Sequence, residues 1–283
     1  MTARLGLGTA QFGLAYGIAN ARGKPSDAEV QAVLDAALGG GIALLDTAPA
    51  YGDAECRIGA CAPAALPIVT KTCGDSDVRT GLAKSLRHLR REGVHALLVH
   101  DRHALLGPDG DALFAVLVEL RDAGLATKVG VSVYHPHEAD TLLARYPLEV
   151  MQLPLNVLDQ RAHSSGLLTR LAARGVEVHA RSPFLQGLLL LAPEHVPFAR
   201  AAARVPLVAF RTRARELGLT PLQAAIGFAR AVPGIDVVVA GVEDAMQLRE
   251  LVAASVPLAP DDWSDLACDA LDVVDPSRWS TQA

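Results

Sequence analysis

Four side chains in the first hundred residues have the types and the spacing that proton transfer to a small molecule requires. Asp46 ends a short apolar run, and Tyr51 follows five residues later in a loop. Two later apolar runs end in a similar way, at Lys71 and at His100. A carboxylate at the end of a buried strand is costly unless another group pairs with it or uses it. These four residues are therefore candidate catalytic residues.

Together these side chains suit the protonation of a carbonyl oxygen. A phenol has an unperturbed pKa of about 10, which makes it a poor proton donor at neutral pH. A neighbouring ammonium such as that of Lys71 favours the phenolate, and Asp46 would keep that ammonium charged and oriented. The imidazole of His100 could hydrogen-bond a substrate oxygen. Tyr51 would then give a proton to the oxygen while another group delivers hydride to the carbon.

The elements that carry these residues alternate between apolar and amphipathic segments. Strands are predicted at 4–9, 43–47, 68–72, 95–100, 128–133, 149–153, 176–182 and 236–241. Helices are predicted at 27–38, 77–91, 111–123, 137–145, 167–174, 206–217, 220–231 and 244–254. This alternation predicts an α/β fold, a (β/α)8 or TIM barrel, as a single domain over residues 1–283 with 256–283 as a C-terminal tail.

A barrel would bring the candidate residues together. Asp46, Lys71 and His100 would end the second, third and fourth strands, which are neighbours, and active sites of this fold lie at that end of the barrel. Each residue alone also fits a structural role, such as a carboxylate that accepts hydrogen bonds from loop amides. Their equivalent positions on three successive strands favour a common site.

An open doubly wound sheet is the alternative fold. It would place a GxGxxG turn between its first strand and first helix. The segment 6–13 contains glycines without that spacing, and the stretch after it is too long and irregular for a tight phosphate turn. The barrel is the better prediction.

The composition predicts a soluble cytoplasmic protein and leaves the oligomeric state open. The chain has 31 acidic and 26 basic side chains, which gives no support for nucleic acid or an anionic membrane as a partner. Its apolar runs are too short to cross a bilayer, and its N-terminus lacks a hydrophobic signal core. The four cysteines show no CxxC spacing, and we expect them to be reduced.

The chain resembles the aldo-keto reductase superfamily, whose members are NAD(P)H-dependent reductases built on a (β/α)8 barrel. The resemblance is carried by the segments 5–9, 46–55, 70–72, 98–100, 130–132 and 241–243. It implies that Asp46, Tyr51, Lys71 and His100 are the catalytic four, with Tyr51 as general acid, and that the substrate is a small-molecule carbonyl compound. The segments 7–13 and 181–187 also resemble a bacterial subgroup linked with sugar metabolism, which implies a sugar-derived substrate.

The resemblance also implies where the cofactor would bind. Ser132 and Gln152 match residues that hold the nicotinamide carboxamide, although Val133 stands where the family has Asn. Arg181 replaces an aromatic ring that stacks on the nicotinamide, and a planar guanidinium could also stack. Further cofactor positions match Gly8, Thr9, Ser182, Phe184, Leu185, Gln186, Gly187, Gly241, Val242, Glu243, Gln247 and Glu250. Phe184 and Leu185 fit the ordinary core equally well.

The resemblance implies NADPH as cofactor, with NADH possible. Many NADPH-preferring members place Lys or Arg near the end of the eighth strand, because a 2′-phosphate favours a cationic partner. This chain has Gly241 and Gln247 there, with Glu243 between them, and Arg249 could compensate from the following helix.

Two other classes of function compete with a reductase. A nucleotide-binding regulatory subunit on the same fold would bind the cofactor without turnover, and the complete catalytic set argues against it. A metal-dependent barrel hydrolase would need ligands spread over several strands. His135 and His137 flank a proline at a helix start, where capping is the commoner role, so we predict no metal site.

Overall fold

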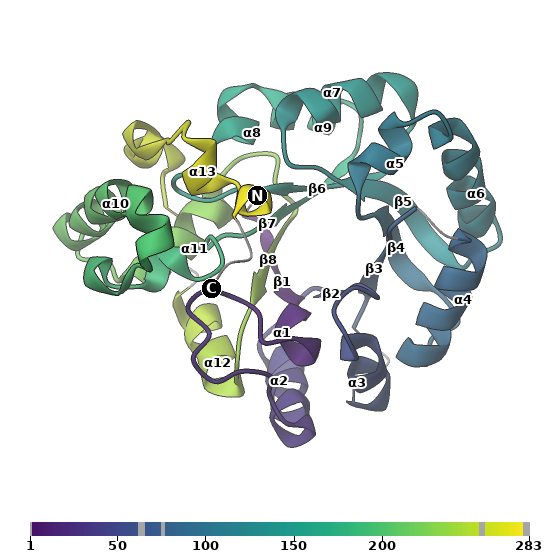
Figure 1. Ribbon diagram of the computed structural model, residues 1–283, viewed down its shortest axis with the longest axis horizontal. Helices are drawn as coiled ribbons and strands as arrows, with labels where there is room; N and C mark the ends of the chain where they lie inside the picture. The colour runs from purple at the N-terminus through teal and green to yellow at the C-terminus, as the bar shows by residue number, and fades with distance from the viewer. Residues whose placement is uncertain (1, 62–65, 75–76, 255–257, 280–283) are drawn as a thin grey trace.

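Eight parallel strands close into a barrel in the order in which they occur in the sequence (Figure 1). The computed structural model describes residues 2–61, 66–74, 77–254 and 258–279. The strands are β1 (Arg4–Gly8), β2 (Leu45–Asp46), β3 (Ile68–Thr72), β4 (Val94–Val99), β5 (Ala126–Ser132), β6 (Val150–Pro154), β7 (Glu177–Arg181) and β8 (Val237–Gly241). β8 pairs with β1, which closes the ring. The predicted single-domain (β/α)8 barrel is therefore confirmed.

Helices surround the strands (Figure 1). Those predicted within a few residues are α2 (Asp27–Gly39), α4 (Val78–Leu89), α6 (Gly110–Asp122), α7 (Pro136–Arg145), α9 (Leu167–Ala173), α10 (Arg204–Glu216), α11 (Pro221–Ala231) and α12 (Ala245–Ala254). The helices not predicted from the sequence are α1 (Ala10–Gly13), α3 (Ala54–Cys61), α5 (Arg102–Leu106), α8 (Arg161–Ser164) and α13 (Leu271–Val274). Most of these are a single turn or little more, too short to show a helical period.

Strand β2 is shorter than the predicted 43–47, yet the backbone around it is hydrogen-bonded to both neighbouring strands. Thr9 N donates to Asp46 O at 3.0 Å, and Thr47 N donates to Val69 O at 2.9 Å. These bonds fix the backbone on both sides of the Asp46 side chain. The residue that ends the strand is therefore held by β1 and β3 together.

Apolar side chains fill both faces of the sheet. Inside the barrel lies a small cluster of Leu44, Val69, Ala96, Leu98, Val150, Val237 and Val239. A larger cluster fills the layer between strands and helices, for example Leu7 and Leu97 against the helices outside. Burial on both faces explains why the strands lack polar and apolar alternation.

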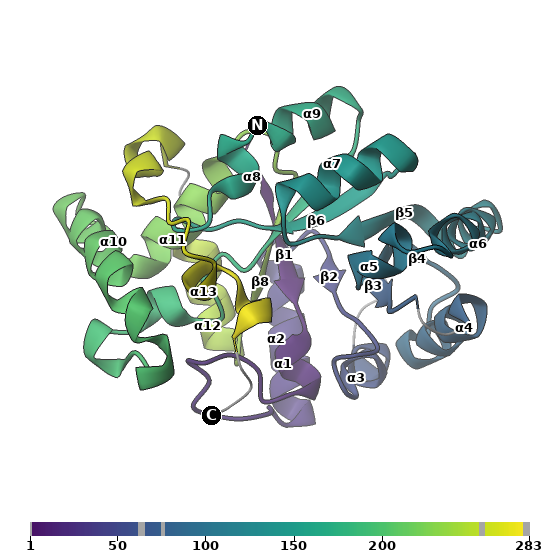
Figure 2. The ribbon, with the colours of Figure 1, turned by 45° about the horizontal axis from the view of Figure 1, so that its top comes forward.

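The C-terminal tail returns to the barrel. In both views α13 lies on the side formed by β7 and β8 (Figure 1 and Figure 2). Val273 and Val274 are buried, and Cys268 N donates to Leu158 O at 2.8 Å. Residues 256–257 and 280–283 of the predicted tail lie outside the described residues. Within the described part of the chain, no helix combines the length and the apolar character that a bilayer span requires.

Candidate active site

A cavity of about 680 Å³ opens at the C-terminal end of the barrel strands. Asp46, Tyr51 and His100 line one part of it. The ends of β5 to β8, the end of β1, the segment after β1 and the tail residue Pro276 also contribute to the lining. This is the end at which active sites of the fold lie. The predicted convergence of the strand ends is what the structure shows.

Asp46, Lys71 and Tyr51 form a connected chain of polar contacts. Lys71 Nζ donates to Asp46 Oδ1 at 2.7 Å and to Thr47 O at 3.0 Å. It also lies 3.4 Å from Tyr51 Oη. Lys71 is 2% exposed and Asp46 is 4% exposed, so the ion pair is nearly removed from water. The ammonium is thus fixed with one N–H directed at the phenol oxygen.

The surroundings set the charge of two members of this group. Burial by itself would lower the pKa of Lys71, but the carboxylate of Asp46 and then Tyr51 outweigh it, so that the pKa is raised. Burial, followed by the charge of Lys71, lowers the pKa of His100 to about 4. At neutral pH the site therefore holds a lysine cation beside a neutral imidazole, which can donate one hydrogen bond.

Two glycines place Tyr51. At Gly13, at the end of α1, an added Cβ would lie 1.7 Å from Tyr51 O. Gly52 has a φ of +61°, and a Cβ there would lie 2.6 Å from Gly13 O. The two backbones approach so closely that side chains at these positions would displace the Tyr51 loop. From the sequence, the glycines of segment 6–13 suggested a weak phosphate turn, a subgroup resemblance and, at Gly8, a cofactor contact, but not this role.

The residues predicted to contact the cofactor line the same cavity, except for Leu185. The lining includes Gly8, Thr9, Ser132, Gln152, Arg181, Ser182, Phe184, Gln186, Gly187, Gly241, Val242, Glu243, Gln247 and Glu250. Leu185 is fully buried and does not line the cavity, because its side chain packs into the core. Leu185 was predicted either to contact the cofactor or to pack in the core, and the structure places it in the core.

Gln152 has a second partner that the resemblance did not suggest. Its Nε2 donates to Asp46 Oδ2 at 2.7 Å. Both oxygens of the buried carboxylate are thus occupied, one by Lys71 and the other by Gln152. The amide of Gln152 joins β6 to the Asp46–Lys71 ion pair, and Gln152 also lines the cavity.

Arg181 packs against a residue that the sequence analysis missed. Its guanidinium lies 4.1 Å from the centroid of the Tyr134 ring and donates to Val133 O at 3.0 Å. Arg102 lies 5.0 Å from the same ring. Tyr134 lines the cavity, two positions after Ser132. Its place beyond a strand end was the available signal.

The loop after β7 is strained. Ser182, Leu185 and Gln186 have φ values of 61°, 50° and 57°, a region that side chains rarely adopt. The Gln186 carbonyl accepts a hydrogen bond from Ile18 N at 3.0 Å, which ties this loop to the segment after α1. Such strain persists where surrounding contacts hold it and is common at ligand sites.

Tyr16, in the segment after α1, also lines the cavity and was missed. Partial burial and then the neighbouring Tyr51 raise its pKa.

The far end of the cavity is acidic. Glu243 N donates to Gln247 Oε1 at 2.9 Å, and Asp244 forms an ion pair with Arg22. Burial raises the pKa of Glu243. Arg249, suggested from sequence as a cation for a 2′-phosphate, is exposed and does not line the cavity. Arg22 is the cation that the structure brings to this end of β8.

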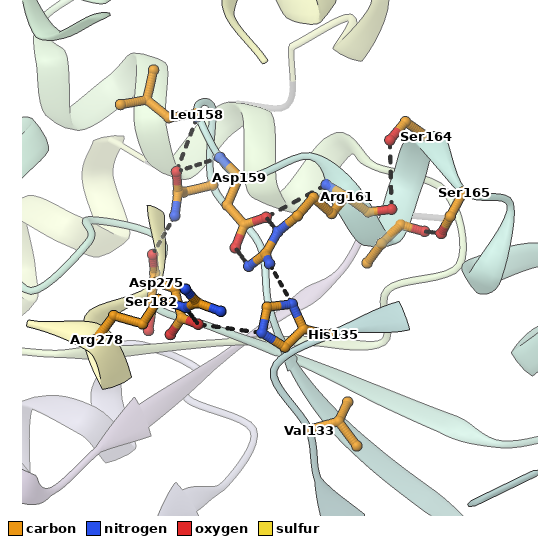
Figure 3. A network of polar contacts seen from close by, with 12 residues as sticks. Val133, His135, Leu158, Asp159, Arg161, Ser164, Ser165, Ser182, Asp275 and Arg278 are labelled. Carbon is orange, nitrogen blue, oxygen red and sulfur yellow. Dashed lines mark hydrogen bonds and ion pairs between the residues drawn. The ribbon is translucent and has the colours of Figure 1, made fainter. Parts of the chain in front are cut away.

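His135 joins the tail to the mouth of the barrel (Figure 3). Its Nε2 lies 3.3 Å from Asp275 Oδ2, and its Nδ1 lies 2.7 Å from Arg161 Nη1. Asp159 holds Arg161 through both carboxylate oxygens. The next residue of the tail, Pro276, lines the cavity. His135 also precedes the first turn of α7, so the predicted position at a helix start is correct, and its ring holds the tail.

A second polar cluster lies at the opposite, N-terminal end of the strands. Glu177 accepts a hydrogen bond from Lys128 Nζ at 2.5 Å and lies 2.8 Å from His179 Nε2. His95 lies 3.3 Å from the same carboxylate. Burial alone would raise the pKa of Glu177, but the bonds from His179, His95 and Lys128 lower it strongly. The Lys128 ammonium already occupies one carboxylate oxygen.

The chain is thus a closed (β/α)8 barrel with a buried Lys71–Asp46 ion pair beneath Tyr51 at its mouth. The model of the aldo/keto reductase family matches residues 4–269. The chain belongs to this family. An aldo-keto reductase from Mycolicibacterium vanbaalenii is 31% identical over 196 residues, which cover 65% of this chain and 68% of the relative.

Solved structures show the same fold. Aldo-keto reductase AKR11C1 from Bacillus halodurans, in its holo form, superposes with a TM-score of 0.75 at 20% identity and covers 94% of this chain and 92% of that one. The thermostable aldo-keto reductase Tm1743 in complex with the inhibitor epalrestat gives a TM-score of 0.71 at 23% identity, with 93% of each chain covered. The family thus supports oxidoreductase chemistry on a carbonyl group.

Proposed function

We propose that this protein reduces an aldehyde or ketone with hydride from NAD(P)H. Tyr51 acts as general acid, Lys71 and Asp46 tune it, and His100 orients the carbonyl. The bound cofactor supplies the hydride and its two electrons to the carbonyl carbon. The proton passes from Tyr51 Oη to the carbonyl oxygen, and the resulting tyrosinate recovers a proton from solvent.

The observation that carries this proposal is the contact between Lys71 and Tyr51. An ammonium 3.4 Å from the phenol oxygen stabilises the negative charge that develops there when the proton leaves. Asp46 and Thr47 hold that ammonium on its other sides. His100, neutral and edge-on to Tyr51 with ring centroids 6.0 Å apart, supplies a donor to the same carbonyl oxygen.

The cavity fits a dinucleotide in chemistry as well as in position. Ser132 and Gln152 lie beside the catalytic group, the strained loop 182–187 follows Arg181, and Gln247 and Glu250 line the far end. We propose NADPH as the cofactor, because the cation Arg22 lies near the far end of the cavity, where it would favour a 2′-phosphate. NADH is the second possibility, because the other charged residues at that end are acidic. The substrate is a small carbonyl compound, sugar-derived by the looser resemblance.

Steady-state oxidation of NADPH and NADH against a panel of aldehydes and ketones tests this function. We expect turnover with at least one carbonyl compound and a preference for one dinucleotide. Tight binding of a dinucleotide with no turnover on any carbonyl would instead support a regulatory subunit. Failure to bind either dinucleotide would overturn the proposal.

A further inference from the structure

Arg181 brings a positive charge to the cavity that no acidic side chain balances. Its guanidinium contacts neutral groups: the Tyr134 ring, Val133 O and the Ser182 hydroxyl. Among the described residues, we find no carboxylate within ion-pair distance of its guanidinium. The charges of Lys71 and Asp46 cancel each other in their ion pair. The catalytic part of the cavity therefore carries one uncompensated positive charge.

This charge borders the space that a hydride donor must occupy. Tyr51 and His100 place the carbonyl on the side of β2 to β4. Beside them, β5, β6 and β7 build a wall with Ser132, Gln152 and Arg181, and β1 and β8 complete the lining. We place the donor against the wall of β5 to β7. Strand pairing holds these three in fixed register, since Ser132 is opposite Gln152 and Arg181 is opposite Pro154, two residues further along β6.

The two redox states of a nicotinamide differ in charge. The oxidised ring is a cation, whereas the reduced ring is neutral. A guanidinium at this wall repels only the oxidised form, and the repulsion is strong because charges in a partly buried site are less screened than in water. Tyr134 and Val133 O hold Arg181 in place, so it cannot turn away at little cost.

We propose that Arg181 makes the cavity hold the reduced dinucleotide more tightly than the oxidised one. This inference rests on the proposed function. Each reduction moves two electrons and a proton, as hydride, from the ring to the carbonyl carbon, and so leaves a cationic ring beside Arg181. The oxidised product is thereby weakly held, which favours its release and biases the enzyme towards reduction.

The test measures Kd for NADPH, NADP+, NADH and NAD+ by fluorescence and calorimetry on the full chain and its variants. We expect Arg181→Gln to lower the ratio of oxidised to reduced Kd by about tenfold, which corresponds to about 30 mV in the midpoint potential of the bound couple. Arg181→Lys keeps the charge and should change the ratio by less than about threefold. Arg181→Met provides a second neutral variant of similar length if Arg181→Gln does not fold.

Two controls test whether the effect of Arg181 acts on the nicotinamide ring. ADP-ribose and its 2′-phosphate lack the nicotinamide, and their Kd should be the same in wild type and Arg181→Gln. Arg215→Gln removes an exposed arginine of α10 outside the cavity and should leave every Kd unchanged.

Three results would overturn the inference. Equal weakening of both redox states and of ADP-ribose would mean that Arg181 binds the phosphates. Unchanged Kd values throughout would mean that Arg181 serves the substrate or the fold. Absence of dinucleotide binding by the wild type would overturn the proposed function as well, whereas the first two results leave that function standing.

Discussion

Each end of the barrel holds a largely buried carboxylate, with two donors at the C-terminal mouth and three at the N-terminal end. At the C-terminal mouth, Asp46 pairs with Lys71 and accepts from Gln152. At the N-terminal end, Glu177 pairs with Lys128 and contacts two histidines. The lysine side chain is 1% exposed at the mouth and 35% exposed at the other end. Similar groups thus occur in two settings that differ in burial.

Under the proposed function, only the ionic cluster at the mouth takes part in catalysis. At the mouth, the ammonium points at a phenol that borders a cavity of about 680 Å³. At the other end, the Lys128 ammonium donates to the Glu177 carboxylate, and no residue of that cluster lines the cavity at the mouth. Lys128 also lines a hollow, of about 730 Å³, so the phenol of Tyr51 beside the ammonium is what distinguishes the two ends. Variants at each end should separate activity from stability.

The largest effect is expected for Tyr51→Phe. Loss of the proton donor should lower kcat about 10³-fold, a typical contribution of general acid catalysis. The Kd of the dinucleotide should change less than about twofold, because the ring itself remains. Tyr16→Phe is the matched control, since it removes a second phenol of the cavity. Full activity in Tyr51→Phe together with a large loss in Tyr16→Phe would assign the donor to Tyr16.

Next in size is Gly13→Ala. The added methyl would lie 1.7 Å from Tyr51 O, so the loop must shift and carry the phenol away from Lys71. A displacement of about 1 Å is expected to lower kcat about 100-fold. Gly39→Ala, where an added Cβ meets nothing within 4 Å, should leave kcat unchanged. Wild-type turnover in Gly13→Ala would show that the close approach does not position Tyr51.

A smaller effect, on stability alone, is expected for Glu177→Gln. Removing the charge leaves Lys128 without its partner and should lower the free energy of unfolding by about 2 kcal/mol, less than for a fully buried pair because Lys128 is partly exposed. Urea unfolding measures this change, and kcat at a temperature well below the melting point should equal that of wild type. A selective loss of kcat would break the contrast between the two ends.

The smallest effect concerns acid stability and His100. Its pKa is lowered from 6.5 in the unfolded chain to about 4 in the folded one. The unfolded chain therefore binds the proton first, so this contribution to stability is complete above about pH 6.5 and is lost as the pH falls towards 4. Unfolding at pH 7, 5.5 and 4.5 should show wild type losing about 1 kcal/mol more than His100→Asn, after allowance for solvent screening. His103→Asn on α5, an exposed position, should follow wild type; identical curves for all three would refute the assignment.

Much of the architecture followed from the sequence alone. Apolar runs at 68–72 and 236–241, separated by amphipathic helices, are enough to predict parallel strands with both faces buried. The strand ends then place Asp46, Lys71 and His100 on neighbouring positions. Short helices such as α5 could not be predicted, because a single turn shows no period and forms only where tertiary contacts stabilise it.

The sequence by itself determined which groups stand at the strand ends, because chain order fixes strand order in a parallel barrel. Only the tertiary structure decided how those groups are used. Gly13 approaches Tyr51, and Gln152 reaches Asp46, across 38 and 106 positions of the chain. Arg181 packs on Tyr134, and Leu185 turns into the core. These contacts depend on how strands and loops meet in space, which no local pattern of residue types records.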